Sequence, residues 1–224
     1  METSLKKYAI IVAAGSGTRM NSSLPKQFLL LKKKPVLFYS IDCFLKAYDD
    51  LEIILVLPQL HISKGQEIID AWFDNSRIRI CEGGATRFHS VQNGLALIET
   101  ESIIFVHDAA RCLLTQSLVK RSYKAAVEFG TAIPGIPVKD SVRYITDEGN
   151  EVLDRNKVML IQTPQVFHSK ILLPAYKIDY KEKLTDEASV VDAFGLKVRM
   201  IEGEVNNIKI TTVADILFAE TIIG

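Results

Sequence analysis

Short, unbroken apolar runs alternate along the chain with longer segments in which apolar residues recur at helical spacing. The runs Ala9 to Ala14, Leu51 to Leu57 and Ser102 to Val106 are typical of strands that are buried on both faces of a sheet. Val36 to Ala47 and Thr115 to Phe129 show helical spacing. Strands and helices that alternate in this way predict an α/β fold with a mostly parallel, doubly wound sheet flanked by helices.

The rest of the chain adds weaker signals of the same two kinds, which fit a Rossmann-like arrangement. Pro134 and Pro137 are expected to break the strand that begins at Thr131. Thr185 is expected to cap a helix that begins with acidic residues. The further strands and helices are expected at Ile62 to Phe73, Arg77 to Cys81, Ser90 to Leu97, Thr131 to Val138, Ile171 to Tyr176, Lys197 to Ile201 and Thr212 to Ile222.

A different pattern begins after residue 140. Ser141 to Ile145 and Glu151 to Leu153 flank the polar turn Asp147 to Asn150, which predicts a β-hairpin. Because an isolated two-stranded hairpin is only marginally stable in water, we expect it to lie against another surface. One possibility is that it folds back on its own domain.

Length and charge restrict the class of protein. A chain of 224 residues suits one α/β domain, and 48% hydrophobic residues are ordinary for a globular protein. Lys plus Arg and Asp plus Glu each number 27, so any charge that binds phosphate must be local. This balance disfavours a general nucleic-acid binder.

Cysteine usage and the two ends of the chain indicate a cytoplasmic protein. Cys43, Cys81 and Cys112 are widely spaced and lie outside any CxxC pattern, as reduced cysteines do. The N-terminal apolar run is too short to span a bilayer, so we expect no signal and no membrane segment. Because the chain ends soon after its last predicted helix, we also expect no fused second enzyme domain.

The first predicted strand runs directly into a glycine-rich loop, Gly15-Ser16-Gly17-Thr18-Arg19. Glycines let the backbone approach a ligand closely, and successive N–H groups form an anion-binding concavity. Arg19 and Lys26 can neutralise charge that amides alone cannot. The loop therefore predicts a nucleoside triphosphate site, with an ordinary strand-to-helix turn and surface charges as the alternative.

Three better-known glycine loops do not match this one. A Walker loop ends in Gly-Lys-Ser/Thr, whereas this loop ends in Gly-Thr-Arg, and Lys26 lies well downstream. The dinucleotide fingerprint needs a third glycine at the position of Met20. A kinase loop would be accompanied by HRD and DFG motifs, which the chain lacks.

Two later strands also end in candidate ligand-binding residues. Gly84 and Ser90 could present amides and a hydroxyl to the edge of a base, or could form a simple turn with a serine cap. Asp108 follows a buried strand, where a carboxylate can hold Mg²⁺ beside a triphosphate, or can cap the next turn. We expect the preceding His107 to be a hydrogen-bonded core imidazole, because no further ligand lies at metal-binding spacing.

Two cations in the second half of the chain suit an anionic ligand. Arg155 lies at the base of the hairpin, and its planar guanidinium favours bidentate phosphate binding, although a lone arginine often forms a surface ion pair. Lys209 is flanked by apolar residues in Asn207 to Thr211, and an unpaired buried ammonium is costly unless an anion meets it.

The motifs AAGSGTRM, LPKQ, GG…R..S, HDAAR, DRN, QTPQ, TDEAS and NIKIT occur in that order over nearly the whole chain. Together they resemble the signature of nucleotidyltransferases that act on sugar or polyol phosphates. Within that superfamily the chain is similar to the 2-C-methyl-D-erythritol 4-phosphate cytidylyltransferases. The resemblance implies one nucleotidyltransferase domain over residues 1–224, with an arm at residues 139–157 that reaches a second subunit and makes a homodimer.

The resemblance also implies roles for individual residues. Arg19, Lys26 and Lys209 would be catalytic, and Asp108 would hold Mg²⁺. The nucleotide would contact Ala13, Ala14, Gly15, Ser16, Gly17, Gly84, Ser90, Asp108 and Ala109. The polyol phosphate would contact Asp108, Arg111, Ser141, Arg155, Thr163, Thr185 and Lys209.

The implied reaction joins CMP from CTP to 2-C-methyl-D-erythritol 4-phosphate and releases pyrophosphate, in isoprenoid precursor synthesis. An anionic phosphate oxygen is already a nucleophile, so the lack of a Ser-His-Asp or Cys-His arrangement is consistent with this chemistry. One alternative is a cytidylyltransferase that acts on ribitol 5-phosphate. Another is a nucleotide-binding module without turnover.

Overall fold

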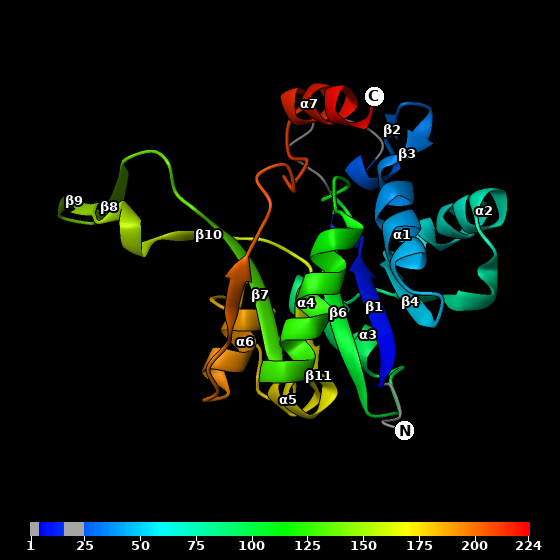
Figure 1. The fold of residues 1–224 in the computed structure, drawn as a ribbon, viewed down its shortest axis with the longest axis horizontal. Coiled ribbons are helices and arrows are strands. Elements are labelled where there is room, and N and C mark those ends of the chain that lie inside the picture. Colours follow the sequence, from blue (N-terminus) through cyan, green and yellow to red (C-terminus); the bar gives the residue numbers. More distant parts are fainter. Residues whose placement is uncertain (1–4, 16–24) are drawn as a thin grey trace.

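The computed structural model describes residues 5–15 and 25–224 (Figure 1). Its main sheet has the order β10-β7-β11-β6-β1-β4-β5, with β12 paired to β7. The strands are β1 (Lys6–Val12), β4 (Leu51–Leu57), β5 (Ile78–Glu82), β6 (Ser102–Asp108), β7 (Thr131–Pro137), β10 (Met159–Ile161), β11 (Gln165–His168) and β12 (Met200–Glu202). Neighbours among β1, β4, β5 and β6 run parallel, which confirms the predicted α/β fold.

Helices cover both faces of this sheet, as the alternation of side chains along β1 requires (Figure 1). Ala9 and Ile11 belong to the core cluster that includes α1, α2 and α4, whereas Tyr8 and Ile10 belong to the cluster with α3, α5 and α6. The helices are α1 (Val36–Ala47), α2 (Ile62–Trp72), α3 (Arg87–Leu95), α4 (Gln116–Phe129), α5 (Ser169–Ala175), α6 (Glu187–Ala193) and α7 (Val213–Ile223), with 3-10 turns η2 (Lys26–Phe28), η3 (Gln59–His61), η4 (Asn75–Arg77) and η5 (Arg155–Lys157). None of the helices in the described part of the chain has the length and apolar character needed to cross a membrane.

The strands at one side of the sheet differ from the sequence-based expectation. Strand β11 was not predicted, and it runs antiparallel between β6 and β7. The expected break in the strand that begins at Thr131 is wrong, because β7 continues through Pro134 to Pro137. Proline removes a donor but keeps its acceptor, and the Pro134 carbonyl accepts a hydrogen bond from Gln162 N at 2.8 Å. The late strand β12 is shifted and runs from Met200 to Glu202.

The predicted hairpin is present as β8 (Val142–Thr146) and β9 (Gly149–Leu153), which form a separate two-stranded antiparallel sheet. Figure 1 shows it standing away from the main sheet at the end of two extended connections. The hairpin therefore does not fold back on its own domain (Figure 1).

A third, smaller core joins a segment near the start of the chain to the segment that contains Ile210 and Ala219. The short strands β2 (Leu30–Leu31) and β3 (Lys34–Pro35) lie beside α7 (Figure 1). Leu31, Ile210 and Ala219 belong to one buried cluster there. This packing brings the segment around Lys209 next to the segment that follows the glycine loop.

Candidate active site

The carboxyl ends of the parallel strands bring three loops side by side. The register of β1 and β6 pairs Val12 with Asp108, and Ala109 N donates to the Val12 carbonyl at 3.1 Å. On the other side, Gly83 N donates to the Leu57 carbonyl at 2.8 Å. Ligands of doubly wound folds bind beyond this edge of the sheet.

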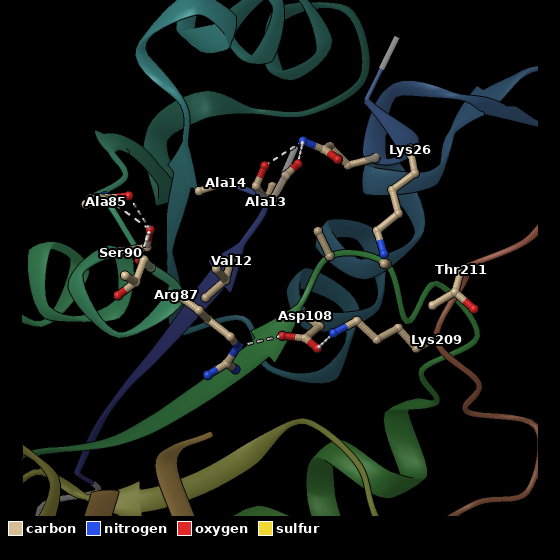
Figure 2. Close-up of a pocket in the computed structure, with 16 residues that line it drawn as sticks. Val12, Ala13, Ala14, Lys26, Ala85, Arg87, Ser90, Asp108, Lys209 and Thr211 are labelled. Carbon is tan, nitrogen blue, oxygen red and sulfur yellow. Dashed lines mark hydrogen bonds and ion pairs between the residues drawn. The ribbon is translucent and has the colours of Figure 1, made fainter. Parts of the chain in front are cut away.

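A cavity of about 450 Å³ opens between these loops (Figure 2). Most of the predicted nucleotide-binding and catalytic residues line it. Ser16, Gly17 and Arg19 lie outside the described residues. The predicted residues that line this cavity are Ala13, Ala14, Gly15, Lys26, Gly84, Ser90, Asp108, Ala109 and Lys209.

A second cavity of about 170 Å³ adjoins the first. It is lined by Arg111, Thr163 and Thr185, which were predicted to contact the polyol phosphate. Among the described residues, the two cavities share three lining side chains, which are Arg87, Asp108 and Lys209.

Two predicted contacts of the polyol phosphate, Ser141 and Arg155, line neither cavity. Both are exposed at the ends of the hairpin, and Arg155 Nη1 donates to the Lys139 carbonyl at 2.8 Å. Within one chain, the structure does not bring these two residues to the other predicted site residues.

Cations from opposite ends of the chain meet in the larger cavity (Figure 2). Lys26 Nζ donates to the carbonyl of Ile210 at 2.9 Å, directly beside Lys209. The next residue, Gln27, uses its amide to hold the Ala13 carbonyl at 2.6 Å, and so ties this segment to the end of β1. The predicted proximity of Lys26 and Lys209 is therefore observed.

Asp108 lies between two cations at the boundary of the cavities (Figure 2). Arg87 Nε donates to Oδ1 at 3.1 Å, and Lys209 Nζ donates to Oδ2 at 2.7 Å. Burial alone would raise the pKa of this carboxyl, but the charges of Arg87 and Lys209 outweigh it and hold the pKa well below its usual range. Asp108 is thus an ionised carboxylate. Its side chain binds Arg87 and Lys209 and does not cap the next turn, which was the alternative.

Arg87 and Glu187 lie outside the residues predicted to be catalytic or to bind the substrates. Arg87 Nη1 and Nη2 donate to the two carboxylate oxygens of Glu187, at 2.5 and 3.1 Å. Glu187 was interpreted only as an early acid of a capped helix, and the cap itself is Asp186, not Thr185. A signal was present, because Glu187 precedes Val190 and Val191 by three and four positions and so shares their buried helix face.

Ser90 and Gly84 shape the loop that follows β5. The predicted helix start at Ser90 is wrong, because α3 begins at Arg87 with Thr86 as its cap. Ser90 Oγ accepts from Gly84 N at 3.1 Å and donates to the Thr86 carbonyl at 2.9 Å. A Cβ on Gly84 would lie 2.4 Å from the Cβ of His89, so glycine is required there. The contact of Gly84 and Ser90 with a base stays a prediction.

His107 is the hydrogen-bonded core imidazole that the sequence predicted. Its Nδ1 lies 3.0 Å from Thr163 Oγ1, and its Nε2 lies 3.2 Å from the Arg111 carbonyl. The Arg111 carbonyl can only accept, so Nε2 carries the ring proton and donates to it. Nδ1 is then an acceptor and receives the hydrogen of the Thr163 hydroxyl, whose oxygen accepts from Asp108 N. Burial lowers the pKa of His107 to about 3, so the ring is neutral.

This neutral imidazole makes stability depend on pH. In the unfolded chain His107 takes up a proton below about pH 6.5, whereas the folded chain does not. The free energy of unfolding is expected to fall by about 2 kcal/mol between pH 6.5 and pH 5 from this group. Urea unfolding of the protein and of His107→Gln at both pH values checks this, with His61→Gln, a partly exposed histidine, as the control.

The contribution of His107 also has a direct readout that does not need the variant to fold. The ring carbon and nitrogen resonances of His107 in the native protein are expected to stay those of a neutral imidazole down to pH 5. A titration of this ring with a midpoint near pH 6 would contradict the assignment.

Comparison of the sequence with known proteins shows the family of this chain. A family model described as 2-C-methyl-D-erythritol 4-phosphate cytidylyltransferase matches residues 8–224. The chain is 40% identical over 219 residues to the protein of that name from Phocaeicola vulgatus, and the match covers 98% of this chain and 100% of the relative. A relative of the same name from Bacteroides thetaiotaomicron is 41% identical over 212 residues, with 95% and 97% covered.

Solved structures agree with this result. 4-Diphosphocytidyl-2C-methyl-D-erythritol synthase from Anaerococcus prevotii superposes with a TM-score of 0.82 at 30% identity, over 96% of this chain and 97% of that chain. The 2-C-methyl-D-erythritol 4-phosphate cytidylyltransferase from Thermus thermophilus gives a TM-score of 0.75 at 29% identity, with 98% of each chain covered. The resemblance inferred from the motifs is confirmed, and the chain belongs to the 2-C-methyl-D-erythritol 4-phosphate cytidylyltransferase family.

Proposed function

We propose that this chain transfers CMP from CTP to 2-C-methyl-D-erythritol 4-phosphate, releasing pyrophosphate, in the non-mevalonate route to isoprenoid precursors. Besides family membership, one observation carries the proposal. Two adjoining cavities share Arg87, Asp108 and Lys209, so a nucleotide in the larger and a polyol phosphate in the smaller would meet at a charged boundary. The whole of residues 1–224 would act as one nucleotidyltransferase domain in the cytoplasm, with free thiols at Cys43, Cys81 and Cys112.

The reaction needs positioning and charge more than proton transfer. An oxygen of the acceptor phosphate forms a bond to the α-phosphorus of CTP while the bond to the pyrophosphate oxygen breaks. Because that nucleophile is anionic at neutral pH, no general base is required. Lys26, with Arg19, would hold the triphosphate and the leaving pyrophosphate, and Lys209 would approach from the acceptor side, where Asp108 orients its ammonium.

Mg²⁺ fits the site as an ion that accompanies the nucleotide. Within residues 5–15 and 25–224 no three His, Cys, Asp or Glu side chains are grouped to hold a metal. Asp108 offers a single carboxylate, whose two oxygens already accept from Arg87 and Lys209. Phosphate oxygens of the nucleotide and water would therefore supply most of the ligands of the ion, as is common for Mg²⁺. When bound, the ion would neutralise charge on the triphosphate.

The hairpin is proposed to be a dimerisation arm, formed by residues 139–157. Tyr144, Ile145 and Val152 expose 58%, 72% and 69% of their surfaces on it, and an isolated hairpin of this kind is marginally stable alone. A second copy of the chain would cover these side chains. The same contact would carry Ser141 and Arg155 to the smaller cavity of the other copy, which explains why they are remote from it within one chain.

The proposed activity is tested by one pyrophosphate-release assay. It crosses four nucleoside triphosphates with two acceptors, 2-C-methyl-D-erythritol 4-phosphate and ribitol 5-phosphate. We expect turnover with CTP and the first acceptor. A preference for ribitol 5-phosphate would reassign the substrate, and the absence of release with every pair would leave only a nucleotide-binding module.

Replacement of Arg155 tests both its role and the dimer. Arg155→Ala is expected to raise KM for the polyol phosphate about tenfold or more, with a smaller change in KM for CTP, because a bidentate phosphate contact is lost. A larger effect on KM for CTP would reassign the residue. Arg143→Ala, on the same arm, is the matched control.

Mixing two variants shows which copy supplies Arg155. At a polyol phosphate concentration well below KM, Arg155→Ala and Lys209→Ala each lower the rate at every site of their own dimers by about tenfold or more. If Arg155 acts across the dimer, a mixed dimer holds one fully wild-type site, and an equimolar mixture should recover about a quarter of wild-type activity. If Arg155 acts within its own chain, no site of the mixture is fully wild-type, and the rate stays at or below that of Arg155→Ala alone.

A further inference from the structure

Four side chains of alternating charge form a continuous row from helix α6 to the boundary between the cavities. Glu187 binds Arg87 through two hydrogen bonds, Arg87 binds Asp108 through Nε, and Asp108 binds Lys209. Three of these residues line both cavities. Glu187 lines neither of them.

The carboxylate of Glu187 is unusually buried, because 0% of the surface of this residue is exposed. A buried charge is costly unless it is paired and hydrogen-bonded. Besides Arg87, the hydroxyl of Tyr176 donates to Glu187 Oε1 at 3.0 Å. Tyr176 is itself fixed by stacking on Phe88, with ring centroids 4.7 Å apart. Glu187 is thus rigidly held at the far end of the row.

The two hydrogen bonds to Glu187 fix the plane of the Arg87 guanidinium. With Nη1 and Nη2 engaged, Arg87 presents Nε to Asp108 Oδ1, and this leaves Oδ2 facing Lys209. A guanidinium whose Nη groups were released would be a strong bidentate ligand for phosphate. Since Arg87 lines both cavities, such a group would lie where both substrates carry phosphate.

We propose that Glu187 is a positioning residue for the transfer reaction: it restrains Arg87, so that Arg87 orients Asp108 and Lys209 and does not itself bind a substrate phosphate. This inference rests on the proposed function and adds a residue to it. Glu187 acts only through Arg87.

Glu187→Gln separates this role from a purely structural one. The amide keeps the shape and one acceptor oxygen but replaces the other with an NH2 donor, so Arg87 loses the charge of its partner and at least one Nη group is released. We expect kcat to fall about 30-fold while KM for the polyol phosphate also falls, about threefold, because freed Arg87 binds the acceptor in an unproductive way. A loss of folded enzyme would lower the apparent kcat but would not lower KM.

The double variant Arg87→Gln/Glu187→Gln tests whether the effect passes through Arg87. Its KM for the polyol phosphate is expected to lack the decrease seen with Glu187→Gln alone. Glu101→Gln is the matched control, since Glu101 also pairs with two basic side chains but precedes the amino end of β6, opposite Asp108. It is expected to leave both constants unchanged.

The outcomes distinguish the inference from the function on which it rests. A wild-type protein without cytidylyltransferase turnover contradicts the proposed function itself. An active wild type, with KM unchanged or raised in Glu187→Gln, contradicts the positioning role. If Glu187→Gln does not fold, Glu187→Asp, which keeps the charge but withdraws it from Arg87, is measured for the same fall in KM, and a wild-type KM overturns the proposal.

Discussion

Replacing Lys209 with alanine is expected to lower kcat by about 10²- to 10³-fold, the loss typical of one preorganised donor at a developing charge. Lys209 Nζ lies 2.7 Å from Asp108 Oδ2, at the boundary shared by the two cavities. A bound acceptor phosphate would meet this ammonium before it reached the nucleotide. The charge acts where the new phosphorus–oxygen bond forms, so the loss should appear mainly in kcat.

The same substitution should change stability little. The Lys209 side chain is 36% exposed, and its removal leaves Asp108 paired with Arg87. We expect the free energy of unfolding to fall by less than about 1 kcal/mol, as for partly exposed ion pairs. Single-turnover assays at saturating substrates, together with urea unfolding, separate the two effects.

Lys46→Ala is the matched control for Lys209→Ala. Lys46 forms an ion pair of similar length, 2.8 Å, with Asp42 on the surface of α1. It is expected to keep wild-type kcat. Near-normal turnover of Lys209→Ala, with the fold intact, would remove Lys209 from the catalytic residues.

The central strands and their helices were predictable because each is long and locally consistent. Leu51–Leu57 and Ser102–Asp108 are seven-residue strands whose buried side chains face both ways, and such runs have few other stable environments. Gln165–His168 could not be recognised in this way. It has four residues, two of them polar, and it becomes a strand because β6 and β7 offer hydrogen bonds on both sides.

In the site, too, residues that belong to a short motif were predictable, whereas contacts between distant segments of the chain were not. Asp108 and Gly84 belong to motifs in which the chemistry and the turn lie within a few residues of each other. The partner of Arg87 lies 100 residues away, so no local pattern pairs them. The start of helix α3 was also misplaced. Thr86 is the cap, but Ser90, inside the helix, has a hydroxyl that suits a cap equally well in the sequence.

Replacing Asp108 with asparagine is expected to lower both activity and stability. The substitution keeps the size of the side chain but removes the charge that Arg87 and Lys209 share. Asp108 is only 9% exposed, and loss of one partner from a buried charge network typically costs about 3 kcal/mol of unfolding free energy. Because Lys209 then loses its anchor, kcat is expected to fall at least about 100-fold.

The pH dependence of this stability difference identifies the cause. The pKa of Asp108 is lowered in the folded protein, so its contribution is present above the pKa of an unfolded aspartate, near 3.9, and is lost only as pH falls through the lower folded value. The difference in unfolding free energy between wild type and Asp108→Asn should therefore be constant from pH 8 to pH 5, although both proteins lose stability below pH 6.5 through His107. Urea unfolding at pH 8, 6.5 and 5 measures it. A difference that already shrinks between pH 8 and pH 5 would show that Asp108 takes up a proton there, and that Arg87 and Lys209 do not hold its charge.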